Sequence, residues 1–256
     1  MIKKDSKIFL DKENFIVFRL TPWDSKVFGF NTLEILDIEY NNEDNLNLLL
    51  IKADEFFENK NIKLVYCRIS TEDVFLKKCL INKNYILTEL TYDIVNAEIQ
   101  ETDFISIFQK KIDVLLPTEE DFIQIKDIAK TVFKFGRFHE DPFIDNDKAN
   151  MRYYNWIDDL KKQGKTFLVC KNKDISSGFI SFLKEEDEVE LILGGMKDKY
   201  RFNACFFWSS FLERLKEQGV SKVSTRISSS NIAILNLYIR LGFKIKKSWL
   251  GFHKHI

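Results

Sequence analysis

The segment Ser228–Phe243, SSSNIAILNLYIRLGF, constrains the fold of this chain more than any other stretch. Asn231 can cap a helix here, because its side chain accepts from the free N–H groups of a first turn. One apolar helix face is predicted by four residues at intervals of three and four: Ile234, Leu235, Tyr238 and Leu241. Gly242 suits a left-handed helix stop, and Phe243 would begin a strand. On helix physics alone, the segment is a core helix that ends at a glycine.

Length and charge limit the classes of protein that the chain can belong to. Its 256 residues suffice for one large or two modest domains. Lys and Arg total 39, and Asp and Glu also total 39, so no general basic surface for nucleic acid is expected, although a local basic patch is allowed. With 24 phenylalanines but only 9 glycines and 3 prolines, the chain reads as packed and globular with few linkers.

The cysteines and histidines predict neither disulfides nor a metal site. None of the 4 cysteines belongs to a C-x-x-C pair, which favours buried, reduced thiols and a cytoplasmic protein. The histidines, His139, His253 and His255, have no ligand spacing to the cysteines. No apolar run is long enough for a signal peptide or a membrane span, so no membrane partner is expected.

The first part of the chain, residues 1–108, is expected to form a small α/β domain. Strands are predicted at 15–20, 31–39, 62–69 and 85–97, and helices at 45–59 and from 71–73 to about 83–84. Pro22 and Gly29 predict a loop over 21–30. Residues 77–94 also parallel residues 238–254, since in both a helix stops at Asn or Gly, an aromatic follows, and a strand comes next. This echo is either coincidence or the mark of a partial internal copy.

The second part, residues 109–256, has a longer series of elements. Helices are predicted from Thr118 to about Phe133, from a cap at Asp147 to about Leu160, and over 202–218. Strands are predicted at 111–116, 166–171, 176–184, 188–196, 221–227, 244–248 and 250–256. A polar and aromatic loop is expected over 135–143.

The opening segment resembles the last conserved helix of the GNAT (Gcn5-related N-acetyltransferase) acyltransferases. The matching residues are Asn231, Leu237-Tyr238 and Gly242-Phe243, while Ile234 replaces the usual small residue. The order of elements over 111–256 also resembles the GNAT fold. The resemblance implies an α/β protein with a mixed sheet that splays open between Glu188–Met196 and Ser221–Ile227, preceded by a smaller, partial GNAT-like domain.

The resemblance implies acyl-CoA as co-substrate and places its binding residues. The backbone of Gly194, Gly195 and Met196 would pair with pantetheine, and an N–H there would polarise the thioester carbonyl. The pyrophosphate loop would contain Arg201, Phe202, Asn203 and Ala204, with Asn231 also near the cofactor. Ala204 and Phe206 depart from the glycine or alanine pattern of the family, so binding could be weakened or differently posed.

Tyr238 matches the tyrosine that protonates the leaving thiolate in many GNAT enzymes. A phenol within hydrogen-bond reach of the sulfur is a credible general acid. Without the resemblance, Tyr238 would be interpreted as a core tyrosine with its hydroxyl at the edge.

Two further stretches resemble the TDP-fucosamine acetyltransferase group of the superfamily. One is Arg137-Phe138-His139-Glu140-Asp141-Pro142 with Tyr153, and the other is Pro22-Trp23-Asp24-Ser25 with Phe28-Gly29. The resemblance implies that acceptor-binding residues are Trp23, Asp24, Ser25, Arg137, Phe138, Glu140, Asp141 and Tyr153. His139 is the candidate base for the acceptor ammonium, in competition with Glu140, Asp141, Asp24 and a water chain.

The resulting expectation is an N-acyltransferase of cell-surface polysaccharide biosynthesis. It would move an acetyl or 3-hydroxybutyryl group from CoA to a dTDP-linked 3- or 4-amino-dideoxy sugar by direct attack, and a homodimer is compatible with the sequence. The alternatives are a GNAT enzyme for another amine, such as a peptide N-terminus or a small amine, and a non-catalytic GNAT-fold binding protein.

Overall fold

A computed structural model describes residues 6–256, which form two compact units. The first unit contains the chain up to Leu90 together with Arg137–Ile144 and Ser248–Ile256, and the second contains Thr91–Gly136 and Asp145–Lys247. A division at residue 108 would assign Arg137–Ile144 and Ser248–Ile256 to the second half, whereas they lie in the first unit. The chain therefore enters the first unit again twice after residue 90, at Arg137–Ile144 and at Ser248–Ile256.

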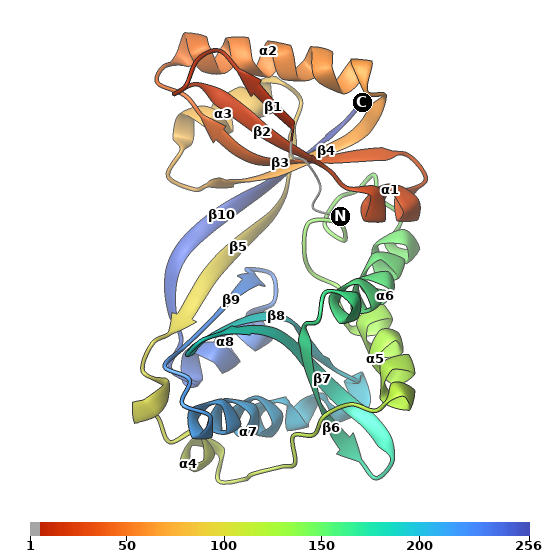
Figure 1. The fold of residues 1–256 in the computed structure, drawn as a ribbon, viewed down its shortest axis with the longest axis vertical. Helices are drawn as coiled ribbons and strands as arrows, with labels where there is room; N and C mark the ends of the chain where they lie inside the picture. Colours follow the sequence, from red (N-terminus) through yellow and green to blue (C-terminus); the bar gives the residue numbers. More distant parts are fainter. Residues whose placement is uncertain (1–5) are drawn as a thin grey trace. The chain divides into compact units, whose positions relative to one another are not determined.

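The sheet of the first unit has the strand order β1-β2-β3-β4-β10 (Figure 1). Its strands are β1 (Ser6–Phe9), β2 (Phe15–Leu20), β3 (Asn31–Glu39), β4 (Ile62–Ser70) and the last part of β10 (Lys244–His255). β3 and β4 are parallel, and the other neighbours are antiparallel. The helices of this unit are α1 (Pro22–Phe28), α2 (Glu43–Asn59) and α3 (Val74–Asn82).

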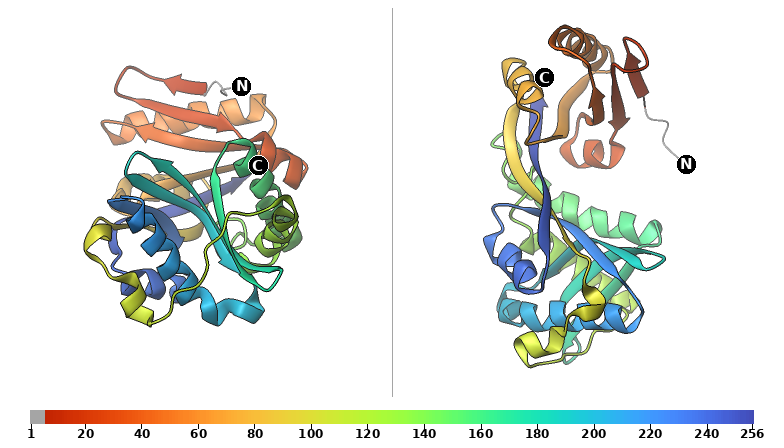
Figure 2. Two further views of the ribbon diagram at one scale, coloured as in Figure 1. Left: turned by 60° about the horizontal axis from the view of Figure 1, so that its bottom comes forward. Right: turned by 90° about the vertical axis from the view of Figure 1, so that its left-hand side faces the viewer.

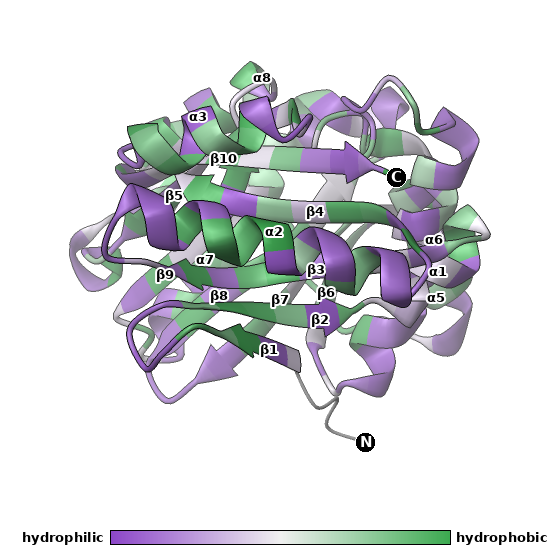
Figure 3. Cartoon of the chain, turned by 90° about the horizontal axis from the view of Figure 1, so that it is seen from above, coloured by the Kyte–Doolittle hydropathy of each residue, from purple (hydrophilic) through white to green (hydrophobic). Residues whose placement is uncertain are grey.

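The two faces of this sheet differ in polarity because successive side chains of a strand point to opposite sides. In β4, Val65, Cys67 and Ile69 pack with apolar residues of α2 and α3. Figure 3 shows hydrophobic (green) and hydrophilic (purple) residues alternating along α2, and its buried residues are Leu46, Leu49, Leu50, Ala53 and Phe57. The alternate residues Tyr66 and Arg68 belong to the other face, where they contact charged groups.

The sheet of the second unit has the order β5-β9-β8-β7-β6. Its strands are β6 (Thr166–Asn172), β7 (Ile175–Glu185), β8 (Glu188–Met196), β9 (Lys222–Ser228) and the end of β5 (Ile86–Asn96). The helices are α4 (Phe104–Phe108), α5 (Glu119–Val132), α6 (Asn146–Lys162), α7 (Ala204–Glu217) and α8 (Ile232–Arg240), with 3-10 turns at Ile99–Glu101 and Asp198–Asn203.

Helices cover both faces of the second sheet, as two further views in Figure 2 show. α5 and α6 pack on one side, where Ile125, Ile157 and Phe179 are fully buried. α7 and α8 pack on the other side with Phe211 and Tyr238. The sheet is therefore the middle layer of this unit.

The two units share one scheme of strand pairing. In each, two antiparallel pairs are followed by a parallel pair and then by an antiparallel exchanged strand. β5 starts in the first unit and ends in the second, and β10 runs the opposite way. Each unit is thus completed by a strand that begins in the other unit.

The sequence echo between 77–94 and 238–254 has a structural counterpart at the two helix stops. Asn84 (φ 64°) after α3 and Gly242 (φ 86°) after α8 are both left-handed. The next residue donates in the same way at both places: Tyr85 N–H to Leu80 O and Phe243 N–H to Tyr238 O, each at 3.0 Å. The two segments therefore end their helices with the same local geometry.

Most predicted elements are present, and the exceptions have physical reasons. Residues 21–30 were expected to be a loop but contain α1, because Pro22 occupies the first helical turn and Gly29 (φ 85°) ends it. Residues 111–116 are not a strand and make one isolated bridge, Leu115 to Val169. The predicted strands 244–248 and 250–256 are one continuous strand, β10. β1 and α4 were not predicted, since both are very short.

No helix within residues 6–256 combines the length and apolar content that crossing a bilayer requires.

The cap of α6 provides a matched test of the structure. Asp145, rather than the predicted Asp147, is the cap residue, and its carboxylate accepts from the N–H groups of Asp147 at 2.7 Å and Lys148 at 3.3 Å. We expect Asp145→Ala to lower the free energy of unfolding by about 1 kcal/mol. The control Asp147→Ala should cost only a few tenths. Urea unfolding followed by circular dichroism measures both, and a larger loss for Asp147→Ala would contradict the assignment.

Candidate active site

The second sheet opens between β8 and β9, as the resemblance to the GNAT acyltransferases implies. The parallel pairing joins only Glu188–Leu191 to Lys222–Thr225. The pairing of β8 with β7 shifts between Leu191 and Leu193, so that Ile192 is an extra, bulged residue. From this bulge to Met196, β8 has no ladder with β9 and offers backbone groups along that edge.

Trp208 of α7 connects the open part of β8 to Tyr238 of α8. Its Nε1 donates a 2.7 Å hydrogen bond to the Tyr238 hydroxyl. A Cβ placed on Gly194 would lie 3.1 Å from Cζ2 of the same indole ring. Trp208 and Tyr238 are only 2% and 4% exposed. Glycine at 194 therefore makes room for the indole that holds Tyr238 in place.

This contact leaves Tyr238 able to donate its proton. The indole has no acceptor, so the phenol oxygen accepts at this contact and keeps its own hydrogen. Burial raises the pKa of Tyr238 well above its ordinary value, although the Trp208 hydrogen bond lowers it in part. The residue thus stays protonated at neutral pH, which is the state that a general acid needs.

Gly195 allows α5 to approach β8 closely. A Cβ at this position would lie 2.7 Å from Cγ2 of Val132. Phe133, which follows α5, stacks on Tyr153 of α6 with ring centroids 4.7 Å apart. Protein side chains therefore already fill the space beside Gly194 and Gly195, and a cofactor would contact this stretch through its backbone edge.

The predicted phosphate loop is a 3-10 turn, Asp198–Asn203, that leads directly into α7. It carries three cationic side chains: Lys197, Lys199 and Arg201. Asn203 caps α7 without a side-chain hydrogen bond, and Phe202 is 70% exposed. Phe206, at a position where the family has a small residue, lies under Lys110, whose Nζ is 4.6 Å from the ring centroid. The turn therefore combines positive charge with a helix N-terminus but lacks a glycine cradle.

The corresponding parts of the first unit lack this chemistry. Leu80 occupies the place in α3 that Tyr238 has in α8, as the matched helix stops show. The turn after β3 ends in Glu43 and Asp44, both in the first turn of α2. A hydrocarbon cannot donate a proton, and carboxylates repel a diphosphate. The features of a cofactor site are therefore confined to the second unit.

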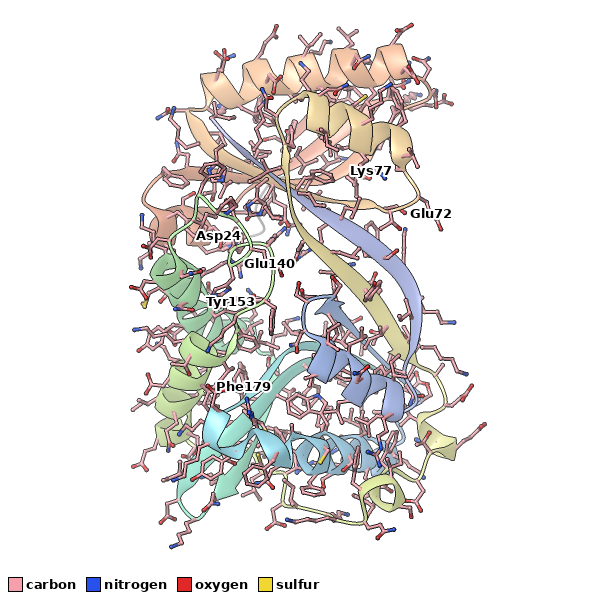
Figure 4. All side chains as sticks on the ribbon, turned by 180° about the vertical axis from the view of Figure 1, so that it is seen from behind. Asp24, Glu72, Lys77, Glu140, Tyr153 and Phe179 are labelled. Carbon is pink, nitrogen blue, oxygen red and sulfur yellow. The ribbon has the colours of Figure 1, made fainter. Side chains whose placement is uncertain are left out.

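The predicted acceptor residues, apart from Tyr153, lie in the first unit on α1 and on Arg137–Ile144; Figure 4 labels Asp24, Glu140 and Tyr153. Asp24 is fully buried and accepts a short hydrogen bond from the Tyr66 hydroxyl. Ser25 fixes α1 to β3, since its Oγ donates to Thr21 O at 3.2 Å and accepts from Thr32 N–H at 2.9 Å. Trp23 is half-buried. These contacts give Asp24 and Ser25 a structural role within the first unit.

Arg137 is buried among carboxylates. Its guanidinium donates to Glu34 at 3.2 Å and lies 4.2 Å from the Tyr66 ring centroid, and its main-chain N–H donates to Glu89 at 3.0 Å. Glu89 also pairs with Arg68 at 2.7 Å. Burial by itself would lower the pKa of Arg137, but Glu34 and the neighbouring groups raise it above the ordinary value. Phe138 beside it packs on Phe28 at 5.2 Å.

Asp141 accepts from two histidines of β10. Its Oδ2 lies 2.6 Å from Nδ1 of His253 and 2.8 Å from Nε2 of His255. Burial would raise the pKa of Asp141, but the two histidine hydrogen bonds outweigh it and hold the pKa below its usual range. Burial lowers the pKa of His253 to about 4, so this ring is neutral at pH 7.

The structure therefore brings the predicted residues together in two groups. Gly194, Gly195, Met196 and Tyr238 lie in the second unit with the phosphate turn, and Tyr153 lies there on α6. Asn231 caps α8 through Ile234 N–H at 3.4 Å, as predicted. Asp24, Arg137, Phe138 and Asp141 share contacts in the first unit. His139 and Glu140 are half-buried between Phe138 and Asp141.

Sequence reasoning missed several partners of these residues: Trp208, Glu34, Tyr66, Arg68, Glu89, His253 and His255. The two histidines carried a usable signal, because a spacing of two in a strand places both on one face. Trp208 and the carboxylates gave no local signal, since their partners are distant in sequence.

No family model matches the chain. The spore coat polysaccharide biosynthesis protein SpsD of Bacillus subtilis (strain 168) is 24% identical over 140 residues, which cover 54% of this chain and 48% of SpsD. The matched stretch thus spans about half the length of that relative.

Solved structures resemble the whole chain. A functionally unknown conserved protein from Staphylococcus epidermidis ATCC 12228 is 15% identical, with a TM-score of 0.66 over 100% of this chain and 96% of that one. A tandem GNAT protein from the clavulanic acid biosynthesis pathway gives a TM-score of 0.63 at 10% identity, over 94% and 78%. A GCN5-related N-acetyltransferase from Sphaerobacter thermophilus also gives 0.63 at 10% identity, over 97% and 82%.

The chain therefore has the mixed α/β fold of the GNAT acetyltransferases, as the sequence resemblance indicates.

The burial of Arg137 makes its role in stability testable. We expect Arg137→Gln to lower the free energy of unfolding by about 3–5 kcal/mol, because Glu34 and Glu89 lose a buried counter-charge. The control Lys244→Gln breaks the exposed pair with Glu98 and should cost under about 1 kcal/mol. Urea unfolding of both variants checks this expectation. Equal losses of unfolding free energy would show that the buried Arg137–Glu34 pair stabilises the protein no more than the exposed Lys244–Glu98 pair.

Proposed function

We propose that the protein transfers an acyl group from acyl-CoA to the amino group of a nucleotide-linked aminosugar. The observation that carries the proposal is the Trp208–Tyr238 pair beside the open end of β8, because it places a protonated phenol where the sheet offers backbone groups. The polysaccharide role named for SpsD supports a sugar acceptor. The residues of Pro22–Ser25 and Arg137–Pro142 support a dTDP-linked 3- or 4-amino-dideoxy sugar.

The residues of the second unit fit acyl-CoA. Lys197, Lys199 and Arg201 supply positive charge ahead of α7, and the stretch from Ile192 to Met196 supplies an open strand edge. Acyl-CoA would provide the activated thioester. Backbone N–H groups of β8 would polarise its carbonyl, because an N–H directed at a developing negative charge stabilises the transition state.

Direct attack by the acceptor amine needs two proton transfers. The ammonium must lose a proton before its nitrogen bonds to the carbonyl carbon, and the departing sulfur must gain one as the C–S bond breaks. Tyr238 donates the second proton. For the first, His139 and Glu140 are the proposed candidates, since Asp24 and Asp141 already accept from Tyr66 and from His253 and His255.

The first unit is proposed to be a degenerate GNAT-like half that contributes to acceptor recognition. Its pairing scheme matches that of the second unit, and the tandem GNAT protein resembles both halves. Its charged face, with Arg137 and Arg68, supplies groups that bind phosphate and sugar hydroxyls. Because Leu80 stands where α8 has a phenol and Glu43 and Asp44 make the turn acidic, we propose no cofactor site among the described residues of the first unit.

Phe206 favours a second candidate function, a non-catalytic binding protein. Its aromatic ring and Ala204 replace residues that let a diphosphate approach the helix start closely. Calorimetry with CoA distinguishes the two candidates, because a binding protein that has lost the cofactor gives no heat of CoA binding.

The function is tested by release of free thiol from acetyl-CoA and 3-hydroxybutyryl-CoA. A panel of dTDP-aminosugars serves as acceptors, with a peptide and a polyamine as controls. We expect release with one aminosugar and not with the controls. Release with the peptide or polyamine alone would assign another amine acceptor. If no thiol is released and calorimetry detects no CoA binding, the result would support the non-catalytic binding protein.

Tyr238 is tested by Tyr238→Phe, with Trp208→Phe as the matched variant. Loss of the general acid should lower kcat by about 100-fold with little change in KM for acyl-CoA. Trp208→Phe removes the indole N–H and part of the buried ring but keeps the phenol of Tyr238, so its kcat should fall less than that of Tyr238→Phe, by about 10-fold. Circular dichroism controls for folding. Full turnover by folded Tyr238→Phe would remove the residue from the mechanism.

A further inference from the structure

A polar cluster occupies the face of the first sheet opposite α2 and α3. It consists of side chains joined by the contacts described above: Asp24, Glu34, Tyr66, Arg68, Glu89, Arg137, Asp141, His253 and His255. Gly251 of β10 makes room for it, because a Cβ there would lie 2.5 Å from Cγ of Glu89. The proposed acyl transfer uses Arg68 and Arg137 of this cluster for acceptor recognition but gives no role to His253 or His255.

We propose that Asp141, His253 and His255 form a binding site for a divalent transition metal ion of the zinc type. The ligand atoms of the three residues all lie within 4.8 Å of one another. His253 and His255 stand two residues apart on β10, which places both rings on one side of the strand. Two imidazoles and one carboxylate form a donor set that suits Zn²⁺ and leaves a coordination position open.

Metal binding requires ligand nitrogens that carry no hydrogen, so His253 Nδ1 and His255 Nε2 must give up the hydrogens that they share with Asp141 Oδ2 when the ion enters. In a tetrahedral site with bonds of about 2.0–2.1 Å, neighbouring ligand atoms are roughly 3.3 Å apart. The contacts from Asp141 Oδ2 are 2.6 Å to His253 and 2.8 Å to His255, so metal entry needs these separations to lengthen by about 0.5–0.7 Å.

Charge also favours a cation at this place. The polar cluster contains the carboxylates of Asp24, Glu34, Glu89 and Asp141 but the guanidinium groups of only Arg68 and Arg137. Two more carboxylates than guanidinium groups leave a formal charge that one dication neutralises.

Burial and access complete the site. His253 is fully buried. Its Nδ1 contacts Asp141, but its Nε2 has no hydrogen-bond partner. The side chain of His255 is 28% exposed, which gives an ion a route from solvent. Asp141 Oδ1 accepts from Phe143 N–H at 2.9 Å and so holds the carboxylate within its turn. A bound metal would fasten Arg137–Ile144 to β10.

The test uses the full chain, freed of metal with a chelator and titrated with Zn²⁺ by calorimetry and with Co²⁺ by visible absorption. We expect one ion per chain and a higher melting temperature with Zn²⁺. His255→Gln should weaken Zn²⁺ binding by at least about 100-fold, because it removes a ligand, whereas removing a group that only hydrogen-bonds to a ligand typically costs about 10–100-fold. His139→Gln is the control, since His139 lies two residues from Asp141 in Arg137–Ile144 but is not one of the proposed ligands.

The outcomes separate the proposal from its rivals. His255→Gln is preferred because replacing the fully buried His253 would test folding as much as binding. Absence of stoichiometric Zn²⁺ binding by the wild-type chain would overturn the proposal. Binding that survives His255→Gln, or that His139→Gln weakens equally, would show adventitious metal and would also overturn it. None of these results depends on acyl transfer, so failure here leaves the proposed function standing.

Discussion

Strand exchange is the constraint on which both sheets depend. The first sheet ends at β4 unless residues 249–255 of β10 pair with it, and the second ends at β9 unless residues 91–96 of β5 do so. An unpaired strand exposes a row of N–H and C=O groups, which are costly to bury and prone to pair wrongly. The exchanged strands remove one such edge from each unit. They also carry Glu89, His253 and His255 into the polar cluster of the first unit.

The same scheme of strands serves two different purposes in the two units. In the second unit, the parallel pair opens at Ile192, and the helices that follow supply cations and a phenol. In the first unit, Leu80 and an acidic turn occupy the equivalent positions. One face of its sheet packs against α2 and α3, and the other face carries the polar cluster. The two units thus share a scheme of strand pairing but differ in the side chains at equivalent helix positions.

The elements that could be predicted from sequence are those whose information is local. The cap at Asn231, the stop at Gly242 and the apolar stripe between them fix α8 without reference to the rest of the chain. The opening of β8 from β9 followed from the family resemblance and not from the residues themselves. The short elements β1, α1 and α4 were beyond reach, because so few residues show no periodicity. Asp145 was passed over as a cap because Asp147 has the same chemistry two residues later.

The site was only partly predictable for a different reason. Tyr238 and the glycines of β8 stand in recognisable motifs, but their contacts come from α7 and α5, far away in sequence. Arg137, Phe138 and Asp141 were identified as acceptor residues from a resemblance, whereas their partners Glu34, Tyr66 and Glu89 lie on strands that give no sign of a site. Long-range ion pairs leave no pattern in a single sequence, since either partner alone looks like an ordinary surface charge.

The exchanged strand β10 also determines when the protein can finish folding. β4 leaves the ribosome before β10, and its partner residues, Trp249–His255, emerge only after residues 71–248 have been synthesised. Until then, Leu64 to Ser70 present an open hydrogen-bonding edge next to an apolar face. Chaperone binding or transient self-pairing of nascent chains would therefore concentrate on this strand. Slow translation of the region between α3 and α8 would lengthen that exposure.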